Sequence, residues 1–394
     1  MIRADPRPLA GVTVIDLTRV LAGPYCTLIL ANLGARVIKV ERPPVGDDAR
    51  LIGPFVGGKS LYFSALNYGK ESIALELRRD EDRAIFEALL GAADVLVENF
   101  RPGVLERLGY GWATLRARWP RLIYAAASGF GHTGPLRGRP AFDMVAQAMG
   151  GILSLTGYPD QPPARVGVSI GDIAAGLFLA VGITSALLKR RDTGAGTMID
   201  VAMLDCQLAI LENALTNHLV TGMVPGRLGT RHPNIAPFQA FATGDGRMIV
   251  VCAGHPEHFE KLCRTIGRPE LLEDPRFVSP YLRRQHADAL ERELERVLRT
   301  RAAAEWLERF EAVGVPCGPV NTVAEAARSP QVEARRMVVG IPDPAIGTLF
   351  VAGNPIKLAD VPEPAAHRPP PELDADREAL LAWLRGRSSR EPDR

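Results

Sequence analysis

The sequence predicts an α/β fold with a large doubly wound domain and a small α+β domain, and three observations lead to this prediction. From Val12 to about Met203, β-branched runs alternate with helical patterns, which is typical of parallel strands joined by crossover helices. Further along, a hairpin pattern precedes three helical patterns. The 394 residues, with a composition ordinary for a folded protein, leave room for two or three domains with a sizeable core.

Short apolar runs mark the strands of the large domain. The candidate strands are Val12–Leu17, Ala35–Glu41, Ser72–Leu77, Asp94–Glu98, Leu122–Ala127 and Met198–Ala202. Pro24–Leu33 and Asp80–Leu90 are the clearest helices between them. Parallel sheets of this kind bind ligands at the carboxyl ends of their strands, so we expect the site there.

The rest of the chain contains the small domain and a return segment. A long helix is predicted over Leu204–Val220, and residues 222–233 have the Gly, Pro and Arg content of a linker or active-site loop. The hairpin and helices of the small domain are Phe238–Thr243, Met248–Val251, Glu257–Ile266, Arg283–Leu298 and Ala302–Val313. Residues 338–358 again resemble short strands, Pro362–Pro371 is a stiff strap, and Asp374–Leu384 is a short helix.

Asp172 is the most informative single residue. It follows Gly171 and precedes the apolar, small-residue run Ile173–Leu188, which predicts a buried helix. In the first turn the positive end of the helix dipole favours an ionised carboxylate. Such a group can attack an acyl carbon, although Asp172 or Ser169 can also be a simple helix N-cap.

Charge and cysteine content exclude several classes of protein. Forty-seven Lys and Arg against 45 Asp and Glu leave a net charge of +2, which argues against broad nucleic-acid binding but permits a local anion pocket. The five cysteines are far apart and show no metal-ligand spacing, so no metal is expected. The first residues lack the apolar core of a signal peptide, and no charge-free stretch is long enough to span a bilayer. A cytoplasmic protein without membrane contact is expected.

Two nucleotide-binding motifs are incomplete. Gly53–Ser60 matches the P-loop expression letter for letter, but no buried strand precedes it and a turn soon follows, so a mobile glycine-rich loop near a site is the better interpretation. The unit from Val12 to Glu41 lacks G-x-G-x-x-G in its first turn, and Pro24 there is typical of a helix start. We therefore expect neither an NTP nor a nicotinamide cofactor.

Five motifs in order resemble the class III CoA-transferases, the group of formyl-CoA transferase and carnitine CoA-transferase. They are Val14–Pro24, Leu33–Arg42, Val97–Gly103, Ala127–Pro135 and Gly171–Gly176. His232–Asn234, Asp274–Phe277 and Val315–Pro319 extend the match over nearly the whole chain. Five ordered motifs are far more specific than one short expression.

The resemblance implies the domain plan and the oligomer. It implies a Rossmann-like large domain made from residues 1–224 and 326–394, a small α+β domain at 225–325, and a homodimer whose two chains interlock like linked rings. The proline-rich strap and the returning C-terminal strands are compatible with interlocking, which the periodicity itself does not show.

The resemblance also implies the reaction. Asp172 matches the family's catalytic aspartate, which would attack the donor thioester and become an aspartyl-CoA thioester that the incoming acid resolves without ATP. Backbone N–H groups near Gly171 or in the 253–255 loop could stabilise the oxyanions. The implied partners are an acyl-CoA, which brings coenzyme A as part of the substrate, and a carboxylic acid acceptor.

The residues implied to bind CoA follow the same family pattern. They are Leu21, Ala22, Arg42, Leu75, Arg78, Asn99, Phe100, Arg101, Arg107 and Leu108. Arg42 and Arg107 suit phosphate because guanidinium groups bond bidentately, although either alone could be a solvated surface charge. Asn99 could also be a turn residue before Pro102.

Departures from formyl-CoA transferase bear on the substrate. That enzyme has glutamine at the position of Leu21, glutamate at that of Asp143 and histidine at that of Arg19, which weakens formyl-CoA and oxalate as expectations. The segment 229–241 resembles members that move CoA among succinate, glutarate or citramalate. Arg50 or Arg231 could pair with the distal carboxylate of such an acid.

Two alternatives remain open at this point. An α-methylacyl-CoA racemase needs an acid and a base on opposite sides of Cα, and that branch has histidine directly before the aspartate where this chain has Phe142. His132 lies nearby in a glycine-rich turn, where histidine is more often structural. A non-catalytic CoA-binding protein would keep Arg42 and Asn99 but would not need Asp172.

Overall fold

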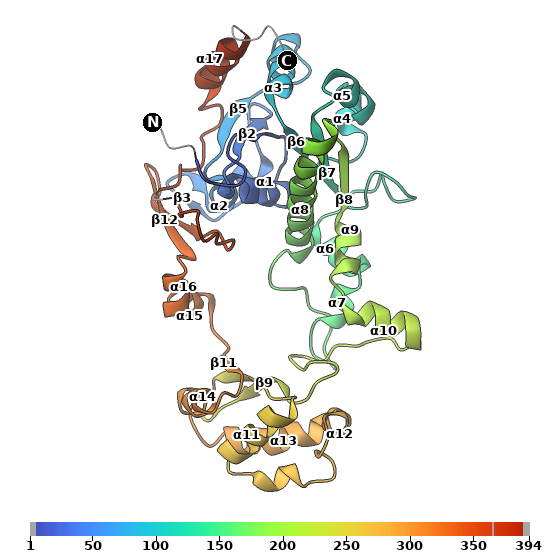
Figure 1. Cartoon of the computed structure of the whole chain (residues 1–394), viewed down its shortest axis with the longest axis vertical. Coiled ribbons are helices and arrows are strands. Elements are labelled where there is room, and N and C mark those ends of the chain that lie inside the picture. The colour runs from blue at the N-terminus through green and yellow to red at the C-terminus, as the bar shows by residue number, and fades with distance from the viewer. Residues whose placement is uncertain (1–4, 365, 389–394) are drawn as a thin grey trace. The chain divides into compact units, whose positions relative to one another are not determined.

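The computed structural model describes residues 5–364 and 366–388 (Figure 1). The first residues, considered above for a signal peptide, and the polar C-terminal end lie partly outside these ranges. The chain divides into two compact units, the first made of Met1–Leu153, Arg165–Met223 and Glu333–Arg394 and the second of Ser154–Ala164 and Val224–Val332. The second unit thus includes Ser154–Ala164, a segment inside the predicted first domain.

A six-stranded parallel sheet forms the centre of the first unit. Its strands are β1 (Thr13–Asp16), β2 (Arg36–Glu41), β5 (Glu71–Ala74), β6 (Val95–Glu98), β7 (Ile123–Ser128) and β8 (Met198–Ala202). Their order is β5-β2-β1-β6-β7-β8, and every neighbouring pair is parallel. The six predicted strands and the α/β class are confirmed. The strand order reverses between β1 and β6, which is where such sheets open a crevice for a ligand.

Helices cover both faces of this sheet because consecutive strand residues point to opposite sides. Val14 and its counterparts on other strands pack with Leu30 of α1 (Ala22–Asn32) and Leu179 of α8 (Ile170–Thr193). Ile15 and its counterparts pack against the other layer. That layer consists of α3 (Asp80–Ala92), α4 (Val104–Arg107), α5 (Trp112–Arg118) and α17 (Arg377–Ser388). The sheet edge above these two cores is therefore rigidly placed.

The remaining elements of the first unit surround the sheet. They are a 3-10 turn (Asp48–Leu51), α2 (Leu61–Asn67), α6 (Asp143–Met149), α7 (Ile152–Leu155), α9 (Met203–Ala209), α10 (Asn213–Thr221), and the antiparallel hairpin β12 (Val338–Asp343) and β13 (Gly347–Ala352). α16 (Pro330–Ala334) begins in the second unit. The single helix predicted over Leu204–Val220 is wrong, because the chain breaks at Glu212, whose φ of 51° is left-handed. Helical periodicity continued across this break and concealed it.

The second unit is a three-stranded antiparallel sheet packed on helices. Its sheet order is β11-β10-β9, with β9 (Phe238–Ala242), β10 (Met248–Cys252) and β11 (Cys317–Pro319). Its helices are α11 (Pro256–Thr265), a 3-10 turn (Pro269–Leu272), α12 (Pro280–Gln285), α13 (Ala287–Leu298), α14 (Ala303–Ala312) and α15 (Val323–Ala327). The predicted hairpin is confirmed. The helix predicted over Arg283–Leu298 is two helices separated at His286.

The P-loop expression forms a hairpin. β3 (Phe55–Val56) and β4 (Lys59–Ser60) pair antiparallel around Gly57 and Gly58, both with positive φ. Lys59 bonds to the carboxylates of Asp343 at 2.8 Å and Glu372 at 2.6 Å. The expression thus folds as a hairpin whose lysine is held by two carboxylates, and not as a phosphate cradle.

α8 has 24 residues and a mean hydropathy of 1.8 over its most apolar window, so by length and composition it could cross a membrane. Half of that window is buried inside the fold, against α1, β7 and β8. Core helices of soluble proteins share these properties, and the helix is a part of the sheet's own core.

Candidate active site

The predicted CoA-binding residues follow the carboxyl ends of four adjacent strands. Leu21 and Ala22 come after β1, Arg42 directly after β2, Leu75 and Arg78 after β5, and Asn99–Arg101 directly after β6. Because parallel strands end at one edge of the sheet, these segments lie along the same crevice. Arg107 and Leu108 lie at the end of α4, which follows β6.

The turn between β1 and α1 is strained and firmly held. Val20 has a φ of 66°, which is unfavourable for a β-branched residue. Its N–H donates to Asp47 Oδ1 at 2.9 Å. Asn99 Oδ1 accepts the Arg19 N–H and Asn99 Nδ2 donates to the Arg19 carbonyl, each at 2.8 Å. The strand-end segments after β1 and β6 are thus tied to each other, and the turn residue Leu21 has a defined place.

Buried charged side chains hold the turn between β1 and α1 in place. Lys39 Nζ donates to the Thr18 carbonyl at 2.8 Å and pairs with Asp47 Oδ2 at 2.9 Å, and the Lys39 and Asp47 side chains are both 0% exposed. Asp16 pairs with Lys70 at 3.1 Å, again with no exposure. Lys70, Lys39 and hydrogen bonds from Thr18 and Thr27 overcome the cost of burial and hold the pKa of Asp16 far below its usual value.

Asp172 lines a cavity together with the predicted CoA segments. The cavity has a volume of about 220 Å³ and lies within the first unit. Its lining residues are Arg19, Val20, Leu21, Ala22, Asp48, Asn99, Phe100, Arg101, Pro102, Ala127, Ser128, Gly129, Arg139, Pro140, Ala141, Phe142, Asp172 and Met203. Five of the ten predicted CoA-binding residues therefore share one cavity with the predicted nucleophile.

Small residues on α8 bring Asp172 to this place. Gly176, one turn after Asp172 on the same helical face, lies so close to α1 that a Cβ there would be 2.7 Å from the Ala22 carbonyl oxygen. At the helix start, Gly171 N–H donates to Asp143 Oδ1 at 2.8 Å. The close approaches to α1 and α6 fix the first turn of α8 against the Leu21–Ala22 turn.

The Asp172 side chain does not cap its helix. Ser169 is the N-cap residue and forms no side-chain capping bond. Among residues 5–364 and 366–388, no hydrogen bond or ion pair to the Asp172 carboxylate is found. The capping interpretation therefore fails for both residues, and the carboxylate is left facing a cavity without a protein partner.

Burial, and then the nearby charge of Asp143, raise the pKa of Asp172 to about 7. The helix dipole alone predicted a carboxylate held ionised at neutral pH, and that prediction is wrong in direction because it left out burial. Asp172 therefore titrates near neutral pH. A desolvated carboxylate without hydrogen bonds is more nucleophilic than a solvated one once it is ionised.

The other predicted CoA-binding residues lie outside the cavity lining. Arg42 is largely exposed and pairs with Glu76 at 3.3 Å, Arg78 and Arg107 are exposed, and Leu108 packs against the sheet core. The Leu75 side chain is buried in that core, so only its backbone borders the edge. These residues extend the edge along which an elongated ligand such as CoA could lie.

The sequence-based interpretation missed two features of the site. Arg139–Phe142 contribute to the cavity wall, although they belong to no regular element. Tyr62 of α2 has a raised pKa because of burial, with the charges of Asp172, Asp47 and Asp143 adding to the effect. The run Arg137-Gly-Arg139-Pro140 before Asp143 was a usable signal for the first, and nothing in the sequence pointed to the second.

Two predicted helpers are already engaged. Arg50 forms two bonds to Glu41, at 2.7 and 2.8 Å, and Arg231 in the second unit pairs with Asp288 and Glu291. Both guanidinium groups are therefore already paired and are not free to bind the distal carboxylate of a dicarboxylic acid. The Gly171 N–H, expected as an oxyanion donor, is taken by Asp143.

His132 lies beside Glu98. Its Nε2 is buried and lies 3.8 Å from Glu98 Oε1, and His132 is absent from the cavity lining. No histidine lines the cavity beside Asp172, so the paired proton-transfer groups that a racemase needs are not assembled in the described part of this unit.

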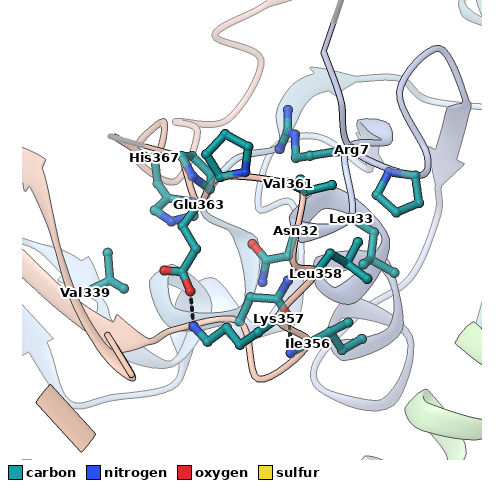
Figure 2. A pocket seen from close by; sticks show the side chains of 14 residues that line it. Arg7, Asn32, Leu33, Val339, Ile356, Lys357, Leu358, Val361, Glu363 and His367 are labelled. Atoms are coloured by element: carbon teal, nitrogen blue, oxygen red, sulfur yellow. Dashed lines mark hydrogen bonds and ion pairs between the residues drawn. The ribbon is translucent and has the colours of Figure 1, made fainter. Parts of the chain in front are cut away.

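A smaller cavity of about 100 Å³ lies where the proline-rich strap passes the N-terminal segment (Figure 2). Asn32, Lys357, Glu363 and His367 line it, and Lys357 pairs with Glu363. None of the predicted site residues is there. Across residues 5–364 and 366–388, no cluster of three or more His, Cys, Asp or Glu side chains suited to a metal ion is found.

Comparison with known proteins gives the family. A model of the family described as CoA-transferase family III matches residues 9–377. The acetyl-CoA:oxalate CoA-transferase of Acetobacter aceti is 49% identical over 96% of both chains. The succinyl-CoA:glutarate CoA-transferase of Mus musculus is 39% identical over 93% of this chain and 84% of its own. The crystal structure of a CAIB/BAIF family protein from Brucella suis has a TM-score of 0.85 at 39% identity and covers 96% of this chain and 99% of that one.

The match over nearly the whole length agrees with the ordered motifs and with the parallel sheet. One of these relatives is named for oxalate, an acid that the departures from formyl-CoA transferase at Leu21 and Asp143 had weakened as an expectation. The protein belongs to CoA-transferase family III and is a CoA-transferase.

Proposed function

We propose that this enzyme moves CoA between dicarboxylic acids and that Asp172 carries the CoA in transit. The observation that carries the proposal is the unpartnered Asp172 carboxylate in one cavity with Leu21, Ala22 and Asn99–Arg101. Relatives named for oxalate, glutarate and citramalate transfer support the dicarboxylate class.

The chemistry balances without an external cofactor. The ionised Asp172 attacks the acyl carbon of the donor thioester, giving a mixed anhydride and the CoA thiolate. The thiolate attacks the aspartyl carbon, releasing the donor acid and leaving an aspartyl-CoA thioester. The acceptor carboxylate attacks that carbon to form a second anhydride, and the released thiolate then attacks the acceptor's acyl carbon, which regenerates Asp172.

Oxyanions form at the aspartyl and acyl carbons during these steps. Since the Gly171 N–H is occupied, we assign this role to a donor outside the helix terminus. The 253–255 loop remains a prediction.

Arginines give the edge of the sheet its affinity for CoA. Arg101 and Arg139 line the cavity without an ion pair in the described part of the chain, whereas Arg19 is paired with Asp48 at 2.9 Å. Arg42, Arg78 and Arg107 extend the positive charge outward. Guanidinium groups bond phosphate oxygens bidentately and so suit the phosphates of CoA.

The enzyme should act as a homodimer, as the resemblance implies. The outward face of α8 carries Leu177, Phe178, Val181 and Leu188, which are 43–63% exposed. A second copy would bury this face. Light scattering at micromolar concentration should give twice the chain mass, and a monomer at that concentration would reject the dimer.

A panel of paired acids tests the reaction. Succinyl-CoA and acetyl-CoA serve as donors, and oxalate, glutarate and citramalate are compared with monocarboxylates of matched length. We expect product CoA esters from the dicarboxylates at a rate at least about tenfold higher, because the second carboxylate contributes roughly the energy of one charge-assisted bond. Equal rates would reject dicarboxylate preference, and exchange of the α-proton without transfer would favour the racemase.

A further inference from the structure

Glu98 is a buried acid for which the transfer reaction has no use. It is the last residue of β6, it is 2% exposed, and it directly precedes the cavity-lining segment Asn99–Arg101. Burying a carboxylate costs hydration energy, so the presence of Glu98 beside that segment requires an explanation.

The Glu98 carboxylate holds the backbone of the segment that follows it. Oε2 accepts the Phe100 N–H at 2.6 Å, and Oε1 accepts the Tyr124 hydroxyl at 2.8 Å. Tyr124 lies on the neighbouring strand β7, is 0% exposed and packs in the sheet core. The bond to Phe100 therefore connects the segment to a rigid part of the sheet.

The environment of Glu98 lacks a strong cation. Its one ion-pair partner in the described ranges is His132, whose buried Nε2 lies 3.8 Å from Oε1 and makes no hydrogen bond. Burial, together with the charges of Glu106 and Asp200, raises the pKa of Glu98 to about 7. A glutamine would avoid this cost but has one acceptor oxygen, whereas Glu98 accepts a bond on each of its two oxygens. The acceptor geometry, rather than stability, therefore explains the residue.

The segment Asn99–Arg101 is bonded to the turn on the opposite side of the cavity, so a movement of one would move the other. Asn99 forms two bonds to the Arg19 backbone, next to the strained Val20, and the Arg19 guanidinium lies 5.4 Å from the centre of the Phe100 ring. A shift of Phe100 would thus move both the β6 segment and the turn that carries Leu21.

We propose that Glu98 is a positioning residue for acyl-CoA, because its carboxylate, fixed by Tyr124, sets the conformation of Asn99–Arg101 and through Asn99 that of the Arg19–Leu21 turn. The inference rests on the proposed placement of CoA at this edge. It assigns Glu98 no contact with the reacting atoms.

Kinetics of three variants test this role. Glu98→Ala removes the acceptor for Phe100 N–H, and we expect the KM for acyl-CoA to rise about tenfold while kcat and the KM for the acceptor acid change less than about twofold. Glu98→Gln keeps an acceptor oxygen and should restore the KM to within about threefold. Tyr124→Phe removes only the bond that fixes Glu98 and should give an intermediate KM.

Amide hydrogen exchange separates positioning from general loss of stability. In Glu98→Ala, the peptide that contains Phe100 should exchange faster while β6 and β7 keep their protection. Faster exchange throughout the sheet, or an unchanged KM in a folded Glu98→Ala, would overturn the proposal. So would Glu98→Gln behaving like Glu98→Ala, because the acceptor geometry would then not be the cause.

Arg101→Ala distinguishes failure of this inference from failure of the CoA site. Arg101 is exposed, so its loss should leave the fold intact. If Arg101→Ala weakens binding of free CoA and Glu98→Ala does not, the positioning role alone is rejected. If neither variant weakens it, CoA does not lie at this edge, and both the site and the inference fall.

Discussion

Two ion pairs, one from each unit of this protein, differ in what surrounds them. At the sheet edge of the first unit, Lys39 and Asp47 pair with no exposure and connect a strand to a loop. In the second unit, pairs such as Lys261 with Glu257 lie one helical turn apart on the exposed surface of α11, with side chains 38% and 63% exposed. Both are ion pairs at similar distances, yet only the first is surrounded by protein.

The difference in exposure indicates different roles: the buried pair positions other groups, and the exposed pair keeps the surface hydrated. A buried pair loses hydration energy that its own attraction only partly returns, so its retention points to the groups it holds, here the Thr18 carbonyl and, through Asp47, the strained Val20. An exposed pair contributes little to stability. The buried pair of the first unit thus holds a strained turn beside the candidate site. The buried charge of the second unit, Arg283, instead donates to three backbone carbonyls and holds that unit's own core together.

Loss of Asp172 should have the largest effect. Asp172→Asn removes the nucleophile while keeping the size of the side chain, so we expect turnover to fall by at least about 10³-fold. Asp192→Asn, an exposed position near the other end of α8, is the matched control and should keep wild-type kcat. Substantial turnover by Asp172→Asn would show that Asp172 is not the nucleophile.

Matched lysine substitutions compare the two kinds of ion pair directly. Lys39→Met leaves Asp47 charged and unpaired in the interior and should lower the free energy of unfolding by about 3–5 kcal/mol. Lys261→Met should cost about 0.5 kcal/mol or less. Urea unfolding followed by circular dichroism measures both, and equal losses would contradict the contrast drawn here.

Asp172 should cost stability at neutral pH. Its pKa in the fold is about 7, above the ordinary carboxyl value of 3.8, so the unfolded chain loses this proton first and stability falls as pH rises from about 4 to 7. Asp172→Asn removes the penalty and should be more stable than wild type by up to about 4 kcal/mol at pH 8. At pH 4 the two proteins should unfold alike, and a gain independent of pH would point to another cause.

Asp143 should tune the pH profile. Because only ionised Asp172 can attack, kcat/KM should fall below pH 7, the pKa of Asp172. The charge of Asp143 contributes to that pKa, so Asp143→Asn should move the acidic limb to lower pH, whereas Asp200→Asn, outside the cavity lining, should leave it in place. An acidic limb that stays at pH 7 in Asp143→Asn would assign it to another group.

The parallel sheet was predictable because each of its strands is a short apolar run between helical patterns, and the ordered motifs pointed to the family and to Asp172. The helix breaks at Glu212 and His286 were not, since helical periodicity runs through both. Tertiary contacts decided these points. A backbone conformation that one residue adopts leaves no trace in a pattern of apolar spacing.

Within the site, the identity of the functional residues could be predicted from the sequence better than their burial and their contacts. The sequence placed Asp172 at the start of a helix and Asn99–Arg101 at a strand end, but a dipole argument could not weigh burial against helix charge. The roles of Asp47 and Lys39 depend on contacts between segments that only the fold brings together. The raised pKa of Tyr62 was equally out of reach, because its burial depends on how α2 packs.

The most direct measurement of the central claim is the mass of the protein during turnover. Wild-type enzyme mixed with succinyl-CoA without an acceptor and quenched in acid should gain the mass of CoA less water, and peptide mapping should place it on Asp172. Asp172→Ala should gain nothing. A wild-type enzyme that transfers CoA but never carries it, or that carries it on another residue, would contradict the account.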